Sequence, residues 1–212
     1  MPKGYWIPHI DVRNLNGYKD YMAATPPAHE KYHGVALVRA GRTEVVEGHQ
    51  RSRNVLREFP DYAAAIACYR SDEYQRARPL RLAHSQCDFI IAEGFDGPQP
   101  QPPQGALPPA PTARKGYWIG HSDVTDFESY KRYMAADQPP IGRFGGRYLI
   151  RGGNQEVTEG KARSRTVVLE FPSYEAALAC YRSDEYQAAK KFRDGNAELD
   201  LVIVEGYDGP KF

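Results

Sequence analysis

The segment EFPDYAAAIACYRSDEYQ (residues 58–75) occurs again, with few changes, as EFPSYEAALACYRSDEYQ (residues 170–187). The repetition extends outward from this segment. Residues 3–98 align with residues 115–210 without a gap, and 51 of the 96 aligned pairs are identical. Solenoid repeats are only about 20–50 residues long, so a unit of this length is domain-sized. The sequence therefore predicts two copies of one domain, residues 1–98 and 115–212.

A proline-rich segment, QPQPPQGALPPAPTAR (residues 99–114), joins the two copies. This composition favours extended polyproline II structure, which acts as a semi-rigid spacer. At about 3.1 Å per residue the segment can reach roughly 50 Å, enough for the second copy to fold back onto the first. We therefore expect the copies to pack together rather than to remain separate beads.

The composition is that of an ordinary globular protein, with 41% apolar and 26% charged residues and a formal charge of +1. Neither a nucleic-acid footprint nor an apolar run of about 20 residues is present, so we expect no nucleic acid and no membrane as partner. The N-terminus lacks the apolar core of a secretory signal. Cys68, Cys87 and Cys180 suit small buried positions in a reducing compartment. We expect a cytoplasmic protein.

Hydrophobic periodicity predicts the same elements in each copy. In the first copy, strands are expected over residues 3–12, 35–41, 43–59 (bent or split at Gly48) and 87–95. One helix is expected to start after Asn14, or Asp126 in the second copy, because such residues cap helix N-termini. Two more are expected after Asp61 (Ser173 in the second copy) and after Ser71. Pro79 is expected to break the last helix in the first copy.

The resulting order, β-α-β-β-α-β, is the ferredoxin-like arrangement. Both helices cover one face of its sheet and leave the other face bare, so that face must be covered. The simplest cover is the same face of the other copy. The predicted fold class is therefore α+β, with two tandem ferredoxin-like units packed as a pseudo-dimeric α/β barrel.

The motifs KGYWIxHxDV, YLIRGG, RSRxVVLEFPSYEAALACYRSDEYQ and VIVEGYDGP resemble the family numbered 1330 among domains of unknown function. The resemblance covers nearly all of both copies and is closer for the second. It implies a dimeric α/β barrel, usually built from two separate chains. The wider superfamily includes antibiotic-biosynthesis-type monooxygenases, haem-degrading enzymes, muconolactone-type isomerases and small-molecule sensors. The resemblance transfers no activity, because fold alone does not choose among these.

Of the six histidines, only His9 and His121 occupy matching positions in the two copies. Their ordinary pKa near 6.5 suits a general acid or base, so they are the candidate catalytic residues. Two other interpretations stay open: a hydrogen-bonded histidine in the core or interface, and a metal or haem ligand.

Recurring arginines and tyrosines are the candidate ligand-binding residues. A guanidinium suits the carboxylate of an acidic metabolite, and an inward tyrosine hydroxyl can orient a ligand. The alternatives are an internal salt-bridge network and core packing. The candidates are Arg39, Arg53, Tyr18 and Tyr69 in the first copy and Arg151, Arg165, Tyr130 and Tyr181 in the second.

The sequence contains no phosphate-binding loop, zinc motif or serine nucleophile elbow, so no metal and no cofactor is expected. Three functions remain: a cofactor-independent acid–base enzyme acting on a small organic acid or aromatic compound, a non-catalytic metabolite-binding or sensing module, and haem binding. The expected partners are a small-molecule ligand and the other repeat, with further homo-oligomers left open. Because the copies differ in several histidines, we expect inequivalent pockets.

Overall fold

The computed structural model describes residues 1–112 and 114–210. The two repeats form the same series of elements in the same order. The first repeat contains β1 (Gly4–Val12), α1 (Leu15–Ala24), α2 (Pro26–Lys31), β2 (Val35–Arg39), β3 (Thr43–Glu47), β4 (Arg53–Phe59), α3 (Tyr62–Arg70), α4 (Asp72–His84) and β5 (Ser85–Glu93). The second contains β6 (Gly116–Val124), α5 (Phe127–Ala136), α6 (Gln138–Arg143), β7 (Arg147–Arg151), β8 (Gln155–Glu159), β9 (Arg165–Phe171), α7 (Tyr174–Arg182), α8 (Asp184–Lys190) and β10 (Ala197–Glu205).

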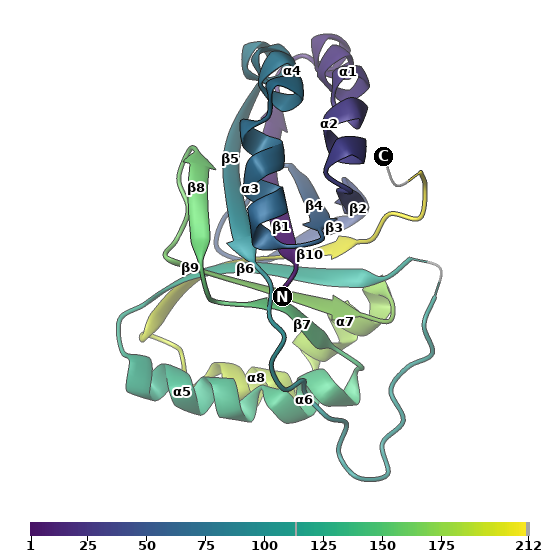
Figure 1. Ribbon diagram of the computed structural model, residues 1–212. Helices are drawn as coiled ribbons and strands as arrows, with labels where there is room; N and C mark the ends of the chain where they lie inside the picture. The colour runs from purple at the N-terminus through teal and green to yellow at the C-terminus, as the bar shows by residue number, and fades with distance from the viewer. Residues whose placement is uncertain (113, 211–212) are drawn as a thin grey trace.

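Each repeat lends one strand to the sheet of the other. The two five-stranded antiparallel sheets have the orders β2-β4-β1-β5-β8 and β3-β10-β6-β9-β7, so β8 pairs with β5 and β3 pairs with β10. Figure 1 shows β8 lying beside β5 in the upper half of the molecule. The segment 43–59 is therefore split at Gly48, which has a φ of 62°, and its first part belongs to the opposite sheet.

The two sheets face each other, and the helices lie on their outer faces (Figure 1). Apolar side chains of both repeats, among them Ile7, Ile90, Ile119 and Val202, form one buried cluster between the sheets. Two further clusters lie between each sheet and its own helices. This arrangement confirms the predicted α+β class and the pairing of two ferredoxin-like units in a pseudo-dimeric α/β barrel.

The helices begin where the sequence predicts. Asn14 accepts hydrogen bonds from the backbone N–H groups of Asn16 and Gly17, and Asp61 accepts one from Ala64. The prediction for Pro79 is wrong, because α4 continues through it to His84. The backbone carbonyl of His84 is held by the N–H groups of Arg13 and Asn14, and this contact anchors the end of the helix.

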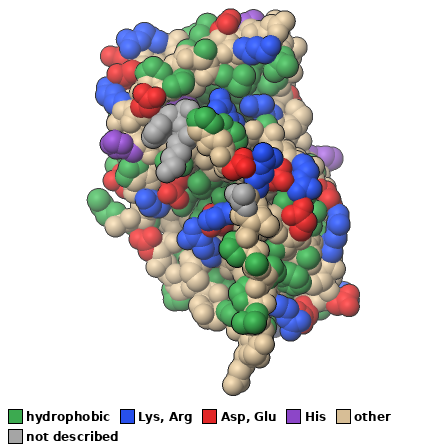
Figure 2. Space-filling view, turned by 90° about the vertical axis from the view of Figure 1, so that its right-hand side faces the viewer, with side chains coloured by type: hydrophobic (Ala, Val, Ile, Leu, Met, Phe, Trp, Pro, Cys, Tyr) green, Lys and Arg blue, Asp and Glu red, His purple; other side chains and the backbone are tan. Residues whose placement is uncertain are grey.

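The proline-rich connection contacts the second repeat near its two ends. The Gln99 side chain pairs with the backbone of Tyr148 on β7, and the Thr112 N–H donates to the carbonyl of Pro172. Acidic and basic side chains are interspersed over the face shown in Figure 2. Within the part of the chain that the structure describes, none of the helices has the length and apolar character needed to cross a bilayer.

Candidate functional site

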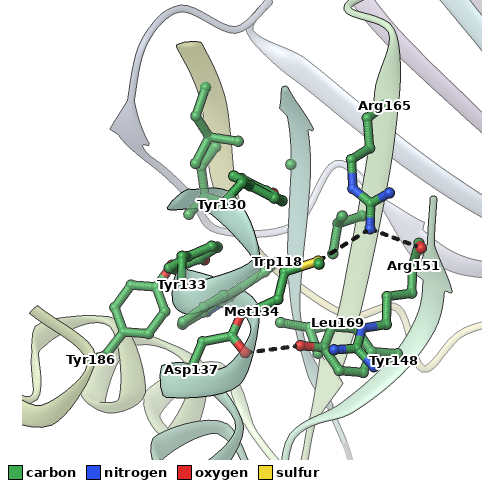
Figure 3. Close-up of a pocket in the computed structure, with 14 residues that line it drawn as sticks. Trp118, Tyr130, Tyr133, Met134, Asp137, Tyr148, Arg151, Arg165, Leu169 and Tyr186 are labelled. Carbon is green, nitrogen blue, oxygen red and sulfur yellow. Dashed lines mark hydrogen bonds between the residues drawn. The ribbon is translucent and has the colours of Figure 1, made fainter. Parts of the chain in front are cut away.

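A cavity in the second repeat lies between the sheet and helices α5 and α8, with Asp137 at the junction of α5 and α6 (Figure 3). Its volume is about 40 Å³, room for about three water molecules. The lining combines aromatic rings with a few convergent polar groups, which is the usual character of a small-molecule site. The lining residues are Trp118, Gly120, Tyr130, Tyr133, Met134, Asp137, Tyr148, Arg151, Arg165, Val167, Leu169, Tyr186, Leu199 and Leu201.

Arg165 on β9 and Arg151 on β7 bring two guanidinium groups to this cavity. Arg165 Nη2 donates to the Arg151 carbonyl at 3.0 Å and lies 3.9 Å from Met134 Sδ. Its buried Nε has no hydrogen-bond partner among the described residues. Neither guanidinium forms a salt bridge within the described part of the chain. Both cations are therefore available to a carboxylate that enters the cavity.

The carboxyl group of Asp137 faces the same cavity (Figure 3). Asp137 is only 5% exposed and accepts hydrogen bonds from Gln138 Nε2 at 2.7 Å and Tyr148 Oη at 3.4 Å. Burial raises the pKa of Asp137 to about 7, and the hydrogen bond from Gln138 and the charge of Arg151 limit the rise. A carboxyl group that titrates near neutral pH can take a proton from a bound molecule and return it.

Tyrosine rings form much of the cavity wall. Tyr130 lies beneath Arg165, with its ring centroid 5.9 Å from the guanidinium carbon, and Tyr148 lies 4.6 Å from that of Arg151. The hydroxyls of Tyr133 and Tyr186 are 2.8 Å apart and hydrogen-bonded to each other. The ring contacts hold the two arginines in place at the cavity.

The first repeat has a matching cavity of about 60 Å³, lined by three of the predicted ligand residues, Tyr18, Arg39 and Arg53. Tyr130, Arg151 and Arg165 line the second cavity, so six of the eight predicted ligand residues lie at one of the two cavities. The other two contact the exchanged strands instead: Tyr69 Oη donates to Glu159 at 2.6 Å, and Tyr181 Oη donates to the carbonyl of Val46 at 3.2 Å.

His9 and His121 lie on the opposite face of the sheets from these cavities. Both are buried between the two sheets, where their Nε2 atoms are 2.8 Å apart. His9 Nδ1 lies 2.6 Å from Asn54 Oδ1, and His121 Nδ1 lies 3.0 Å from Thr166 Oγ1. Burial lowers the pKa of both imidazoles. The structure therefore does not bring the histidines together with the predicted arginines.

Two facing ring nitrogens need one proton between them, so one imidazole donates to the other. We expect His121→Leu to lower the free energy of unfolding by about 1–3 kcal/mol, because His9 Nε2 then stays buried without a partner. The double variant with His9→Leu should cost less than the two single variants together, because the second change removes that unpaired group. Urea denaturation of the four proteins measures the difference, and strictly additive losses would contradict the pairing.

The arginine two positions before β4 in the first repeat has a structural role, and so does its counterpart two positions before β9 in the second repeat. Arg51 pairs with Asp11 and Asp88, and Arg163 pairs with Asp123 and Asp200. These two recurring arginines therefore belong to an internal salt-bridge network, which was the alternative to ligand binding. Arg53 and Arg165, two positions further on, reach the cavities.

The sequence analysis missed Asp137, and with it Tyr133 and Tyr148. The signal for Asp137 was a difference between the copies, because the aligned residue of the first copy is Thr25. A carboxylate that appears in only one of two otherwise similar copies is a candidate for a role restricted to that copy.

Comparison with solved structures finds the same fold at low identity. An anthrone oxidase-like protein matches with a TM-score of 0.58 and 14% identity, over 100% of this chain and 95% of that chain. A candidate monooxygenase from Fusobacterium nucleatum matches with a TM-score of 0.55 and 10% identity, over 100% and 97%. One from Lactobacillus acidophilus matches with a TM-score of 0.51 and 10% identity, over 99% and 98%.

No curated protein matches this chain in sequence. A family model, described as a domain of unknown function, DUF1330, matches residues 3–95 and again residues 115–207. The chain therefore belongs to this family and carries its domain twice.

Proposed function

We propose that the second-repeat cavity is the active site of a cofactor-independent enzyme that moves a proton on a small carboxylic acid. One observation carries the proposal: the buried carboxyl group of Asp137, with a pKa of about 7, shares a cavity with two guanidinium groups that have no carboxylate partner among the described residues. A base poised near neutral pH and an anion clamp are the two parts that such chemistry requires.

The arginines hold the substrate and Asp137 does the chemistry. Arg165 and Arg151 bind the substrate carboxylate through their free N–H groups. Ionised Asp137 takes a proton from a carbon next to the substrate's carbonyl group, and the electron pair of the broken C–H bond moves onto the carbonyl oxygen. The positive charge of the arginines stabilises this oxyanion. Asp137 then returns the proton to carbon, so nothing is oxidised or reduced.

The size of the cavity limits the substrate. A volume of about 40 Å³ holds only a few non-hydrogen atoms. Met134 is the part of the lining that can move aside most readily, because its side chain is unbranched and flexible. We therefore favour short 2-oxo acids over large aromatic compounds.

Hydrogen–deuterium exchange tests this function without knowledge of the final product. In D₂O the protein should catalyse the exchange of the C–H protons of pyruvate or 2-oxobutyrate, followed by proton NMR. The rate should rise with pH through about 7 as Asp137 loses its proton. Asp137→Asn should lower it about 100-fold or more. Arg165→Gln should raise the substrate concentration needed for half-maximal rate.

Asp194→Asn, at an exposed aspartate, is the matched control and should leave exchange unchanged. Exchange that survives in Asp137→Asn would remove Asp137 from the mechanism. Binding of the acids by the wild-type protein with no exchange would favour the non-catalytic binding module instead.

A further inference from the structure

Ser122 on β6 carries a buried hydroxyl that forms no hydrogen bond with any residue that the structure describes. The residue is only 1% exposed. Side chains alternate along a strand, so Ser122 lies on the same sheet face as Trp118 and Gly120, which line the proposed active site. Because buried polar groups are nearly always hydrogen-bonded, this hydroxyl requires an explanation.

A second unpartnered group lies on the neighbouring strand. Ser122 is directly opposite Arg165 on β9 and directly opposite Leu199 on β10, and both of these residues line the cavity. Arg165 Nε is buried and, like Ser122 Oγ, has no hydrogen-bond partner in the described part of the chain. Directly opposed residues have Cβ atoms about 4.5–5.5 Å apart, so the two unpartnered groups belong to one small region.

The Nε edge of the Arg165 guanidinium suits a carboxylate. Along this edge Nε–H and one Nη2–H point in parallel, which is the arrangement that binds both oxygens of a carboxylate. Figure 3 shows Met134 Sδ and the Arg151 carbonyl on opposite sides of Nη2. The thioether of Met134 lies 3.9 Å from Nη2 and is a weak acceptor on a flexible side chain. A stronger acceptor can therefore displace it.

The matching position of the first repeat has no hydroxyl. Ile10 stands there and packs in the apolar cluster between the sheet and the helices of that repeat. Arg53, the counterpart of Arg165, has the same unpartnered Nε and a similar sulfur contact, 3.8 Å from Met22 Sδ. The arginine is therefore common to both repeats, whereas the hydroxyl occurs only in the repeat that contains Asp137.

We propose that Ser122 is a ligand-positioning residue of the second-repeat cavity. The carboxylate of a small acid binds along the Nε edge of Arg165, and the Ser122 hydroxyl donates a further hydrogen bond to one of its oxygens. The bound carboxylate thereby satisfies both unpartnered groups. The inference rests on the proposed function in taking this cavity as a site for small carboxylic acids. Ser122 fixes the orientation of the carboxylate and transfers no proton.

The affinity for pyruvate tests this role. Trp118 lines the cavity and Trp6 is the other tryptophan of the chain, so in a Trp6→Phe background the fluorescence reports on this cavity. Titration with sodium pyruvate should change the emission in a saturable way. Ser122→Ala should raise the dissociation constant about tenfold or more, as expected for one hydrogen bond to a charged group. Ser122→Thr keeps the hydroxyl and should bind pyruvate like the parent protein.

The stability of the unliganded protein separates ligand binding from a structural role. Ser122→Ala removes a buried hydroxyl that has no partner, so its melting temperature without pyruvate should equal or exceed that of the parent. A lower melting temperature would show that the hydroxyl stabilises the fold, and would overturn the proposal. Thr125→Ala, which removes an exposed hydroxyl just after β6, is the matched control and should change neither affinity nor stability.

An affinity for pyruvate that Ser122→Ala leaves unchanged, or a Trp118 signal that ignores pyruvate, also overturns the proposal. The binding assay is separate from the exchange assay on Asp137. Pyruvate binding that depends on Ser122, in a protein that catalyses no exchange, supports the positioning role and contradicts only the catalytic one. Exchange in a protein whose affinity is indifferent to Ser122 contradicts only the positioning role.

Discussion

Replacing Glu159 with glutamine is expected to lower the free energy of unfolding by about 3–5 kcal/mol, because the change leaves a buried cation without its anion. Glu159 lies on the exchanged strand β8 and pairs with Arg81 and Arg78 at the end of α4. Arg81 is fully buried, and its Nε and Nη1 have no hydrogen-bond partner among the described residues. Glu159 also accepts a hydrogen bond from Tyr69 at 2.6 Å.

For a chain of this length the loss corresponds to a fall of roughly 10 °C in melting temperature, measured by calorimetry or circular dichroism. Glu156→Gln is the matched control, because Glu156 lies on the same strand and pairs with Arg70, whose side chain is 63% exposed. An exposed pair is worth at most about 1 kcal/mol. Equal losses of stability in the two variants would contradict the larger contribution expected of the buried pair between the repeats.

Acidification is expected to destabilise the protein through His29. Its folded pKa is about 2, well below the ordinary value of 6.5, so the unfolded chain binds a proton that the folded chain does not. The stabilisation is complete above pH 6.5 and is lost as the pH falls, by about 1.4 kcal/mol for each pH unit below that value. Between pH 6.5 and 4 the expected loss is roughly 3 kcal/mol.

His29→Ile isolates this contribution, because Ile141 already occupies the matching position of the second repeat. The difference in the free energy of unfolding between wild type and variant, measured by urea denaturation from pH 7 to 4, should show this dependence on pH. Asp137→Thr should reveal the opposite slope: a raised carboxyl pKa makes the folded chain bind the extra proton, so acidification below pH 7 favours folding. His49→Lys, at an exposed position, is the matched control variant. Parallel curves for wild type and His29→Ile would contradict the buried neutral imidazole.

The architecture could be predicted because the two repeats of the chain can be aligned with each other. The two copies share the same helix caps and strand patterns, which identified the helices and strands. The sheet face that each unit leaves apolar and uncovered required the other unit to cover it. The sheet that β3 joins could not be predicted in this way. The pattern of residues 43–47 predicts a strand, but the sheet that it joins is set by pairing with β10, which lies more than 150 residues away.

The candidate site was predictable in part for a similar reason. Recurrence identified Arg39, Arg53, Tyr18 and their counterparts, which line the two cavities. Side chains alternate along a strand, so His9 shares a face with Tyr5 and Ile7, and all three lie in the interior between the sheets. The sequence did not show that the arginines would lie on the other face. Asp137 follows a helix at a proline-rich turn, where only the tertiary structure makes a carboxyl group buried.

Fusion of the repeats has an evolutionary consequence. In a barrel assembled from two identical chains, every mutation is copied into both halves, so neither cavity can change without the other. In one continuous polypeptide this constraint is absent, because each repeat has its own codons. Arg57 can therefore differ from its counterpart Leu169, and Thr25 from its counterpart Asp137. The linked gene duplication therefore allows the two sites to specialise separately while the shared scaffold persists.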